Sequence, residues 1–526
     1  MKTSIISLLV LCVYAVSCTQ GISMEGPAEI AEYGRADFRV LTRELPANPY
    51  LQEKASLDML LTAPSGKELL LPAFWNGKDA WEARFTPQEC GKYIYRFVYR
   101  MAGKKELKSK TGTFVSTSSQ DHGILHNDGF WVLRYDDGTP FRGIGENLCW
   151  ESRESDDSKF FKDLHEQHER FNYEVMLPEF TAAGGNFTRM WMCRWNFPID
   201  RKDNFNNTRY TPSDEYYNPS AVQHLDDVIA LSEELGLKIM LCMGQGDVRA
   251  DRDFFNSDEA KARYRNRLRY IVARWGYSPS IAMWEFFNEI DNIQFRNRPE
   301  PIPAEEIVAW HAEMASYLKS IDPFGHIVTT SISHRDLKGL NDVPDIDLNQ
   351  KHIYRATSAI PETVISYGQR HAKPYVVGEF SYEWDWNRNF DDFAEDMDLD
   401  FKRGLWYGIF NPTPVTPMSW WWEFFQDRGL VPYFKNVRCV SDMMLEKGGG
   451  EFEQLEVEAD GADAYAVRCG KSVFVYAYNP GKKPVKLSVD AGGQLKKFDF
   501  STASFKDALD IEPVRPRTEA LYLIEQ

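Results

Sequence analysis

Eight short apolar segments, separated by segments with helix signals over roughly 300 residues, constrain the fold of this chain more than any other feature. In chain order they are Phe141–Asn147, Asn186–Met192, Leu237–Met243, Ile281–Asn288, His326–Ile332, Ile346–Ile353, Pro374–Glu379 and Thr416–Trp422. Strands that alternate with helices form parallel sheets, and eight such units close into a (β/α)8 barrel. The sequence therefore predicts an α/β fold built on a TIM barrel.

Helix-capping residues between these segments support the alternation. Asn218 is a typical N-cap with Pro219 at the first helical position, and Gly236 suits the end of the same helix. Ser257 is followed by two acidic residues, which favour a helix N-terminus, and this second helix is expected to end near Gly276.

The chain on either side of the predicted barrel is typical of antiparallel β-structure. Apolar and polar residues alternate in Tyr93–Tyr99, and Ser472–Tyr478 is followed by the turn residues Asn479-Pro480-Gly481. Short alternating strands with turns between them predict β-sandwiches. We expect a signal peptide over residues 1–18, an N-terminal β-sandwich over 24–120, a (β/α)8 barrel over 121–445 and a smaller C-terminal β-sandwich over 446–526.

The first 18 residues are predicted to direct export. Lys2 precedes the apolar segment Ile5–Val16, which is too short to span a bilayer core of about 30 Å as a helix. Small residues then lead to Cys18, a pattern that resembles the lipobox of bacterial lipoproteins, in which the Cys carries the lipid. Plain secretion, with cleavage after Ala15–Ser17, is the alternative. We expect a protein of the bacterial periplasm or cell surface, with membrane contact only through a lipid anchor at Cys18.

Charge and aromatic content narrow the class of partner. The 61 Lys and Arg against 78 Asp and Glu give a net charge of −17 without a long basic run, which argues against nucleic acid. Twelve of the 15 Trp lie between Trp150 and Trp422, and none follows. This bias predicts that a flat, ring-shaped ligand binds in the barrel region. No feature of the sequence specifies an oligomeric state.

Two of the predicted strands lead into glutamates. Glu289 follows the fourth strand and Glu379 ends the seventh, and 90 residues separate them, about three βα units of roughly 30 residues each. Barrel enzymes place their chemistry at this end of the strands. Hydrolysis of a glycosidic bond needs two facing carboxyl groups, one that protonates the leaving oxygen and one that attacks the anomeric carbon. Glu289 and Glu379 are therefore the candidate catalytic residues.

The region from about Gly129 to Leu445 resembles the clan A glycoside hydrolases, the retaining (β/α)8 group that includes family 5 cellulases and mannanases. The pair Asn288-Glu289 matches the Asn-Glu of that group at the end of strand four, whose Glu is the acid/base. Glu379 matches the strand-seven nucleophile. Arg189 lies in a segment that resembles strand two, whose Arg supports the nucleophile.

Other rim residues resemble the sugar-binding positions of the group. His352 and Tyr354 lie where it often has a His/Tyr pair after strand six, and Trp420–Trp422 resembles its Trp-bearing strand eight. Alternation on a strand directs Trp420 and Trp422 to one side and Trp421 to the other, so at least one of them packs in the core. The candidate substrate-binding residues are Arg189, Asn288, His352, Tyr354, Trp384, Trp421, Trp422, Asn147 and Trp150.

The resemblance extends to the flanking regions and also has a departure. An N-terminal sandwich, a cellulase-like barrel and a small C-terminal sandwich occur together in exported Bacteroidetes proteins. Strand three, however, ends in Met243-Gly244-Gln245-Gly246-Asp247, where cellulase-type members commonly carry His.

Elementary chemistry assigns the candidate residues complementary roles. Arg189 is always charged and would keep Glu379 ionised, as a nucleophile requires. Asn288 could donate a hydrogen bond to a sugar hydroxyl that strengthens in the transition state. His352 and Tyr354 could orient the nucleophile or bind a hydroxyl.

The sequence thus predicts an exported retaining glycoside hydrolase that cleaves O-glycosidic bonds of a poly- or oligosaccharide by double displacement. The cysteines are scattered without zinc spacing, and we expect no cofactor and no catalytic metal. The alternative is that the two glutamates form structural ion pairs. The protein would then be a non-catalytic carbohydrate-binding or adhesion protein on a TIM-barrel scaffold.

Overall fold

The computed structural model describes residues 17–19, 21–203, 205–244, 250–295 and 300–526. The chain forms two compact units. The first comprises the chain up to Gly123 together with Ser257–Ser278 and Ser316–Gly325, and the second comprises Ile124–Asn256, Pro279–Ala315 and His326–Gln526. Among the described residues, no helix combines the length and apolar character needed to cross a membrane.

The first unit contains two β-sheets, with strand orders β1-β2-β4-β8-β7 and β3-β11-β9-β5-β6, and β10 pairs with β9. Their bounds are β1 Ser17–Thr19, β2 Ile22–Glu25, β3 Glu29–Ala31, β4 Ala36–Thr42, β5 Ala55–Thr62, β6 Glu68–Pro72, β7 Phe74–Trp75, β8 Trp81–Phe85, β9 Gly91–Met101, β10 Leu107–Lys108 and β11 Gly112–Thr117. Buried and exposed residues alternate from Tyr93 to Phe97 of β9, as the sequence pattern predicts. Helix α5 (Asp258–Trp275) also belongs to this unit. Ser257 caps its N-terminus, which confirms that prediction.

The second unit is built on parallel strands. β15 (Gly145–Asn147), β16 (Phe187–Trp191), β17 (Lys238–Cys242), β18 (Ile281–Glu285) and β19 (Ile327–Thr329) pair in that order, and β20 (Ser331–Ile332), β21 (Asn349–Tyr354) and β22 (Tyr375–Ser381) pair in the same way. Parallel bridges join Glu146 of the first strand and Phe380 of the last strand to the same residue, Ser419. Both edges of the sheet therefore meet at one chain segment.

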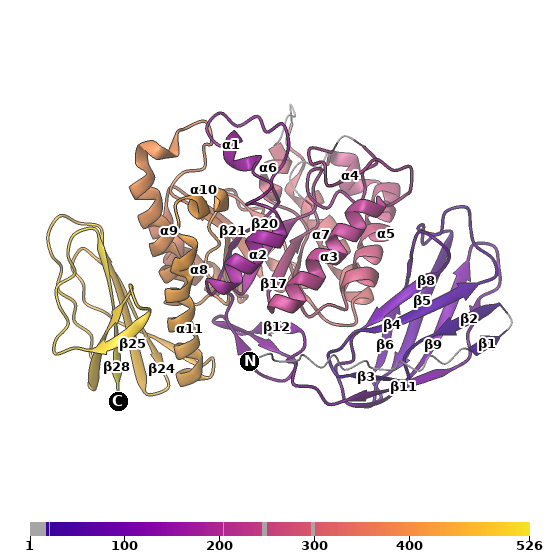
Figure 1. Cartoon of the computed structure of the whole chain (residues 1–526), viewed down its shortest axis with the longest axis horizontal. Coiled ribbons are helices and arrows are strands. Elements are labelled where there is room, and N and C mark those ends of the chain that lie inside the picture. The colour runs from indigo at the N-terminus through magenta and orange to yellow at the C-terminus, as the bar shows by residue number, and fades with distance from the viewer. Residues whose placement is uncertain (1–16, 20, 204, 245–249, 296–299) are drawn as a thin grey trace, which may run out of the picture. The chain divides into compact units, whose positions relative to one another are not determined.

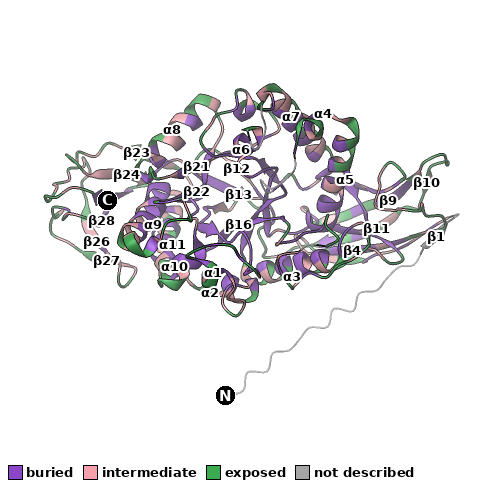
Figure 2. Ribbon diagram, turned by 90° about the horizontal axis from the view of Figure 1, so that it is seen from above, coloured by how far each residue is buried: buried purple, intermediate pink, exposed green. Residues whose placement is uncertain are grey.

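Helices surround these strands, with their exposed faces outward and the buried strands inside (Figures 1 and 2). Their bounds are α1 Lys162–His165, α2 Tyr173–Ala182, α3 Pro219–Leu235, α4 Arg252–Asn256, α6 Ile290–Phe295, α7 Ala304–Ile321, α8 Ile360–His371, α9 Ala394–Ile409, α10 Trp422–Asp427 and α11 Phe434–Gly448. The Asn218 side chain accepts hydrogen bonds from the backbone amides of Ser220 and Ala221, and Gly236 ends α3 in the left-handed conformation. Both features confirm the predicted caps of this helix.

A small antiparallel sheet packs at the beginning of the parallel strands. It consists of β12 (Leu125–Asp128), β13 (Val132–Tyr135) and β14 (Pro140–Phe141). Leu125 and Leu133 share one hydrophobic core with residues near the start of the parallel strands, including Phe187. The opposite ends of the strands are left for polar side chains.

The last predicted strand, Thr416–Trp422, is not a regular strand in the structure, and only isolated bridges at Ser419 pair it with its neighbours. Trp421 has a left-handed backbone (φ +69°), and α10 begins at Trp422. These conformations end the extended chain, so alternation does not decide which Trp faces which side. The fourth strand also ends earlier than predicted, at Glu285.

The C-terminal strands form one antiparallel sheet that packs on α9. The order is β23-β24-β25-β28-β26-β27, with bounds Phe452–Leu455, Asp463–Cys469, Ser472–Asn479, Thr518–Glu525, Gln494–Asp499 and Ser504–Asp507. Trp406 of α9 is fully buried, stacks on Tyr476 with ring centroids 5.6 Å apart, and donates through its Nε1 to the Tyr433 hydroxyl at 2.7 Å. This indole joins the sheet to the helix behind it.

We expect Trp406→Ala to lower the free energy of unfolding by about 3–5 kcal/mol, because it leaves a large cavity and removes the hydrogen bond to Tyr433. The matched control is Leu509→Ala, since Leu509 is 99% exposed and should change stability by less than about 0.5 kcal/mol. Chemical denaturation of both variants measures the difference. Equal stabilities would contradict the packing described here.

Candidate active site

Glu379 is a buried carboxylate surrounded by hydrogen-bond donors. It lies on β22 and its Oε1 accepts from Nη1 of Arg189 at 2.7 Å. Its Oε2 accepts from the Tyr354 hydroxyl at 2.6 Å and lies 3.3 Å from Nδ1 of His352. Tyr354 and His352 both come from β21, the neighbouring strand. The site therefore holds this carboxylate from three directions.

Arg189 is fully buried and connects several of the predicted residues. Its Nε and Nη2 donate to the two oxygens of Glu285 at 2.6 and 2.8 Å. Nη2 also donates to Oδ1 of Asn288 at 2.8 Å, and Nη1 to Oδ1 of Asn147 at 3.3 Å. A planar guanidinium with five N–H donors suits such a hub, whereas an ammonium group could not bridge these positions.

Glu289 lies beyond the end of β18 in a left-handed conformation (φ +50°), which is uncommon for a residue with a side chain. The Ser331 hydroxyl accepts from its backbone amide at 2.9 Å and so supports this geometry. Its Oε1 lies 2.9 Å from Nδ1 of His352, and its Oε2 accepts from the Asn292 amide at 2.7 Å. The strained turn directs the side chain toward Glu379 rather than back into the strand.

The two carboxyl groups face each other at short range. One ligand-type atom from each of Glu289, His352 and Glu379 lies within 4.8 Å of the other two. Retaining glycosidases separate their carboxyl groups by about 5–5.5 Å, whereas inverting enzymes need about 6.5–9.5 Å to admit a water molecule. The observed spacing fits direct attack by one carboxylate.

The same three side chains are the one group among the described residues with metal-compatible spacing. His352, however, directs Nδ1 between the two carboxyl groups. Burial lowers its pKa, but the charge of Glu379 and hydrogen bonds to Glu289 and Glu379 raise it to about 9. A protonated imidazole donates hydrogen bonds and does not bind a cation. The donor set fits a hydrogen-bonded pair of carboxyl groups better than a metal ion.

The environment keeps Glu379 charged. Burial by itself would raise its pKa, but the charge and hydrogen bond of His352, the charge of Arg189 and the hydroxyl of Tyr354 together lower it to about 2. A carboxylate that stays ionised over the whole physiological range is suited to nucleophilic attack.

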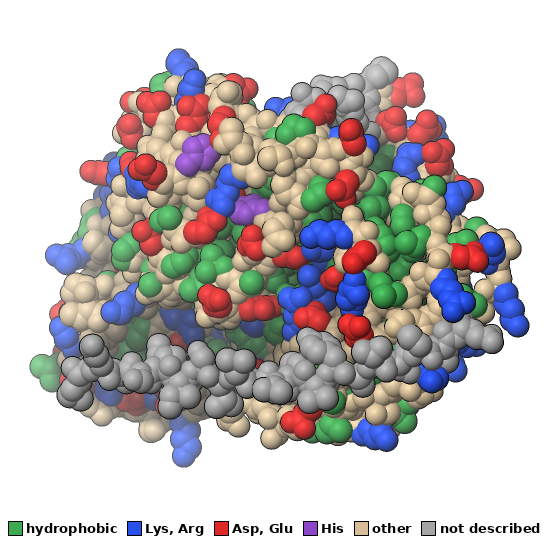
Figure 3. Space-filling view, turned by 45° about the vertical axis from the view of Figure 1, so that its right-hand side comes forward, with side chains coloured by type: hydrophobic (Ala, Val, Ile, Leu, Met, Phe, Trp, Pro, Cys, Tyr) green, Lys and Arg blue, Asp and Glu red, His purple; other side chains and the backbone are tan. Residues whose placement is uncertain are grey.

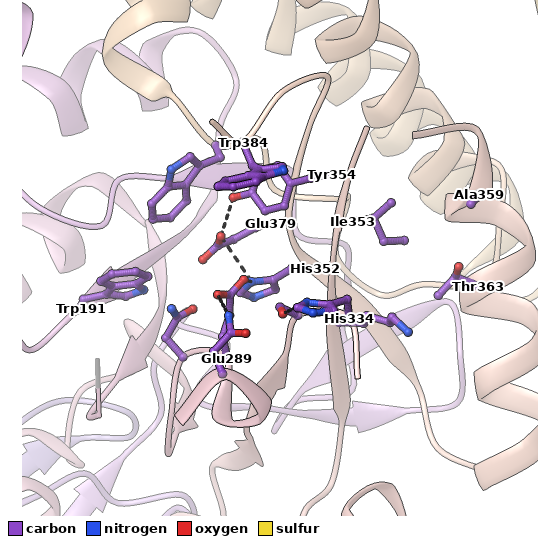
Figure 4. Close-up of a pocket in the computed structure, with 15 residues that line it drawn as sticks. Trp191, Glu289, His334, His352, Ile353, Tyr354, Ala359, Thr363, Glu379 and Trp384 are labelled. Atoms are coloured by element: carbon purple, nitrogen blue, oxygen red, sulfur yellow. Dashed lines mark hydrogen bonds and ion pairs between the residues drawn. The ribbon is translucent and has the colours of Figure 1, made fainter. Parts of the chain in front are cut away.

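The facing carboxylates lie in a cavity of about 850 Å³ (Figure 4). It is lined by Trp191, Asn288, Glu289, Asn292, Ser333, His334, Lys351, His352, Ile353, Tyr354, Ala359, Thr363, Glu379, Trp384 and Trp420. In Figure 4, Trp384 and Tyr354 lie beside Glu379, Trp191 lies at one end, and Ile353, Ala359 and Thr363 lie at the other. The cavity thus continues past the carboxylate pair.

Six of the predicted residues meet in the cavity wall: Asn288, Glu289, His352, Tyr354, Glu379 and Trp384. The other five candidates lie behind this wall: Arg189, Asn147, Trp150, Trp421 and Trp422. Asn147 is fully buried, and its amide nitrogen donates to three backbone carbonyl groups, including that of Gly378 at 3.0 Å. Trp421 is buried and donates to the carbonyl oxygen of Glu383 at 2.7 Å. Trp150 and Trp422 are buried against each other with ring centroids 4.8 Å apart.

Several cavity residues were not predicted from the sequence. Trp191 lies two residues after Arg189 on the same strand, so alternation could have directed attention to it. Of the three adjacent Trp, the structure places Trp420 in the cavity wall and not the candidates Trp421 and Trp422, because the backbone turns at Trp421. Asn292 lies in the short helix α6, which the sequence analysis did not predict, and His334 lies in the loop after β20, where no periodicity indicates direction. The segment after strand three in which the sequence lacks the His of cellulase-type enzymes includes Gln245–Asp247, and these residues fall outside those that the structure describes.

The fold is shared with a crystallised protein from Bacteroides vulgatus described as a "putative glycoside hydrolase". The two structures superpose with a TM-score of 0.67 and 16% sequence identity, over 95% of this chain and 100% of the other. At this identity the likeness establishes the fold alone.

Sequence comparisons identify more specific relatives. Mannan endo-1,4-beta-mannosidase 4 of Oryza sativa is 26% identical over 208 residues, covering 34% of this chain and 42% of the relative. Mannan endo-1,4-beta-mannosidase 3 of Arabidopsis thaliana is 25% identical over 255 residues, covering 41% and 55%. The matched regions thus span about half or less of these relatives. Residues 29–100 match a family model described as a domain of unknown function, DUF5060. The two mannosidase matches confirm the resemblance to glycoside hydrolases that the motifs indicated.

The charges around Glu379 and His352 predict a pH-dependent contribution to stability. The folded-state pKa of Glu379, about 2, is below the unfolded value, so its contribution is present above about pH 4.5 and is lost as the pH falls toward 2. The folded-state pKa of His352, about 9, is above the unfolded value, so its contribution is present below about pH 6.5 and is lost as the pH rises toward 9.

We therefore expect the difference in melting temperature between the wild type and His352→Gln to be largest at about pH 6 and to shrink by pH 9. Thermal unfolding across this range measures it. His371→Gln is a suitable control, because the His371 side chain pairs with the exposed Asp342 at 2.7 Å instead of with a buried carboxylate. A difference for His352→Gln that grows with pH would contradict the electrostatic account.

Proposed function

We propose that this protein is a retaining glycoside hydrolase in which Glu379 is the nucleophile and Glu289 is the acid/base. The observation that carries the proposal is the short approach of the two carboxyl groups inside one cavity, where an oxygen of Glu289 lies within 4.8 Å of an oxygen of Glu379. Their surroundings differ in the way that the two roles require. Glu379 is 3% exposed and held by Arg189 and Tyr354, whereas the Glu289 side chain is 21% exposed and can exchange protons with solvent.

The geometry supports a double displacement. Glu379 attacks the anomeric carbon while Glu289 gives its proton to the departing glycosidic oxygen, which forms a glycosyl ester on Glu379 and releases the first product. Glu289, now ionised, takes a proton from water as that water attacks the anomeric carbon. The ester bond breaks, Glu379 regains its negative charge, and Glu289 is protonated again. The two inversions return the original anomeric configuration.

Neighbouring groups stabilise charge during these steps. The Asn288 carbonyl oxygen is occupied by Arg189, an orientation that leaves the amide nitrogen as a donor for a sugar hydroxyl in the cavity. Tyr354 and His352 compensate the negative charge that returns to Glu379 when the ester bond breaks. Arg189 acts through Glu379 and Asn288, because it lies behind the cavity wall.

We also propose that residues 121–445 form a (β/α)8 barrel, preceded along the chain by a β-sandwich over 24–120 and followed by a smaller one over 446–526. In the C-terminal sandwich, the bridges Glu458–Ser488 and Val485–Val514 lie outside the six-stranded sheet and support a second layer. The parallel pairing from β15 to β22 and the bridges of Glu146 and Phe380 to Ser419 support closure of the barrel. Both candidate carboxylates then belong to the end of the barrel at which such enzymes carry their sites.

The proposed substrate is a poly- or oligosaccharide. Indole rings of Trp191, Trp384 and Trp420 line the cavity and offer apolar faces to sugar rings. The relatives named above act, by their names, on 1,4-linked mannan, so β-1,4-mannan is the first polymer to test. On the face in Figure 3, acidic and basic side chains are interspersed, and together with the net charge of −17 this disfavours nucleic acid as a partner.

We propose further that the protein is exported and tethered to the membrane by a lipid on Cys18, on the strength of the small residues that precede this Cys. Incorporation of labelled palmitate by the wild type, and its absence from Cys18→Ala, would support this localisation. Equal labelling of both proteins would exclude it.

We expect Glu289→Ala to reduce hydrolysis of glycosides with poor leaving groups by about 10²–10⁴-fold, because proton donation to the leaving oxygen is lost. Aryl glycosides with good leaving groups should be less affected in their first step. Azide should then restore turnover by attacking the glycosyl ester on Glu379, and the glycosyl azide should have the anomeric configuration of the substrate.

The assay is a panel of glycans and aryl glycosides that begins with β-1,4-mannan, followed by NMR of the azide product. Glu395→Ala is a suitable control, because this carboxylate lies on α9 outside the cavity lining. An azide product of inverted configuration, or unchanged activity of Glu379→Ala, would contradict the assignment.

A further inference from the structure

Glu383 is a buried carboxylate just beyond β22, four residues after the proposed nucleophile. It is 1% exposed, although it belongs to a loop rather than to a strand. Its Oε1 accepts from the backbone amides of Trp384 and Asp385 at 2.9 and 3.0 Å. Burying a carboxylate is unfavourable unless donors surround it, so this loop is built around the charge of Glu383.

Two arginines complete the set of donors. Nε of Arg355 donates to Oε1 of Glu383 at 2.7 Å, and Nη1 of Arg388 donates to Oε2 at 2.5 Å. Arg355 directly follows Tyr354 at the end of β21 and has a left-handed backbone (φ +62°). Glu383 therefore joins the loop after β22 to the end of the neighbouring strand.

The residue that this network fixes in place is Trp384. Its side chain is among the cavity-lining groups, and the residue is 54% exposed, against 5% for Trp191. The guanidinium carbon of Arg355 lies 5.2 Å from the centroid of the Trp384 ring, a distance at which cation–π attraction orients an indole. An exposed ring without such support would sample several rotamers, and a ligand would have to immobilise it at a cost in affinity.

We propose that Glu383 is a positioning residue for substrate binding: it holds Trp384 at the cavity as a platform on which a sugar ring stacks. It acts through the backbone amides of Trp384 and Asp385 and through Arg355, which it fixes against the indole. Glu383 itself does not touch the substrate. This inference rests on the proposed glycoside hydrolase function. It adds which residue holds the Trp384 ring in position to bind a sugar.

The test compares Glu383→Gln, Trp384→Ala and the double variant on β-1,4-mannohexaose, or, if that is not cleaved, on the oligosaccharide that the wild type cleaves best. Glu383→Gln should raise KM roughly fivefold to tenfold and change kcat by less than about twofold, because stacking contributes to binding in the ground state and the transition state alike. Trp384→Ala should raise KM at least as much. The double variant should match Trp384→Ala, because Glu383 has nothing left to position.

Two further variants separate positioning from a general loss of stability. Arg355→Gln removes the cation that contacts the Trp384 ring. The Arg355 side chain is 49% exposed, so this variant should fold even if Glu383→Gln does not. It should raise KM by itself and have no further effect when it is combined with Trp384→Ala. Asp398→Asn is the matched control, because it breaks a carboxylate–arginine pair with Arg428 at 2.5 Å outside the cavity lining, and its KM should equal that of the wild type.

Calorimetric titration of the hexasaccharide into proteins that also carry Glu289→Ala provides a readout independent of turnover, and the loss of affinity should follow the change in KM. Additive effects of Glu383→Gln and Trp384→Ala, or an unchanged KM for Glu383→Gln and Arg355→Gln in an active enzyme, would overturn the positioning role alone. A wild type that neither cleaves nor binds any glycan would overturn the proposed function and this inference together.

Discussion

The buried guanidinium of Arg189 is the interaction on which the site depends. It satisfies Glu285 with two hydrogen bonds and still reaches Glu379 and Asn288. A buried carboxylate that loses its partner costs roughly 3–5 kcal/mol, so each of these groups is stable in the interior only because the others are in place. The arrangement links three parallel strands through one side chain, and it determines which oxygen of Glu379 is held by Arg189 and which by Tyr354.

The sequence could predict the elements and residues whose positions follow from periodicity and capping. The strands that carry Arg189 and Glu379 lie where the apolar segments predict them, and the cap at Asn218 is confirmed. The catalytic assignment of Glu289 and Glu379 stays a prediction, and the structure adds that the two groups face each other.

What the sequence could not predict lies where the chain leaves regular structure. Trp421 adopts a left-handed conformation and Trp422 starts a helix, so the alternation expected for this segment does not apply and Trp420 lines the cavity. Asn147 has the residue type of a sugar ligand, yet its amide is used by backbone carbonyl groups. Residue type and strand position indicate that a side chain is near the site, but only the local backbone decides whether it faces the cavity.

Two buried carboxylates organise the loops beside the proposed catalytic pair. Asp291, two residues after Glu289, is fully buried and accepts from the backbone amides of Ser333, His334 and Arg335. Glu383 has the same relation to the loop that carries Trp384. In both cases, a buried carboxylate holds a loop whose next ring lines the cavity, His334 in the first loop and Trp384 in the second. The loops after the strands therefore position the binding surface as well as the catalytic pair.

The central claim is that Glu379 forms a covalent bond to the sugar. The most direct measurement is mass spectrometry of the protein after incubation with an activated 2-deoxy-2-fluoro glycoside of the sugar that the glycan panel identifies, because the fluorine slows hydrolysis of the ester. The account predicts one added glycosyl group on the peptide that contains Glu379 and none in Glu379→Gln. Turnover of the natural substrate with no adduct, or an adduct on another carboxylate, would contradict it.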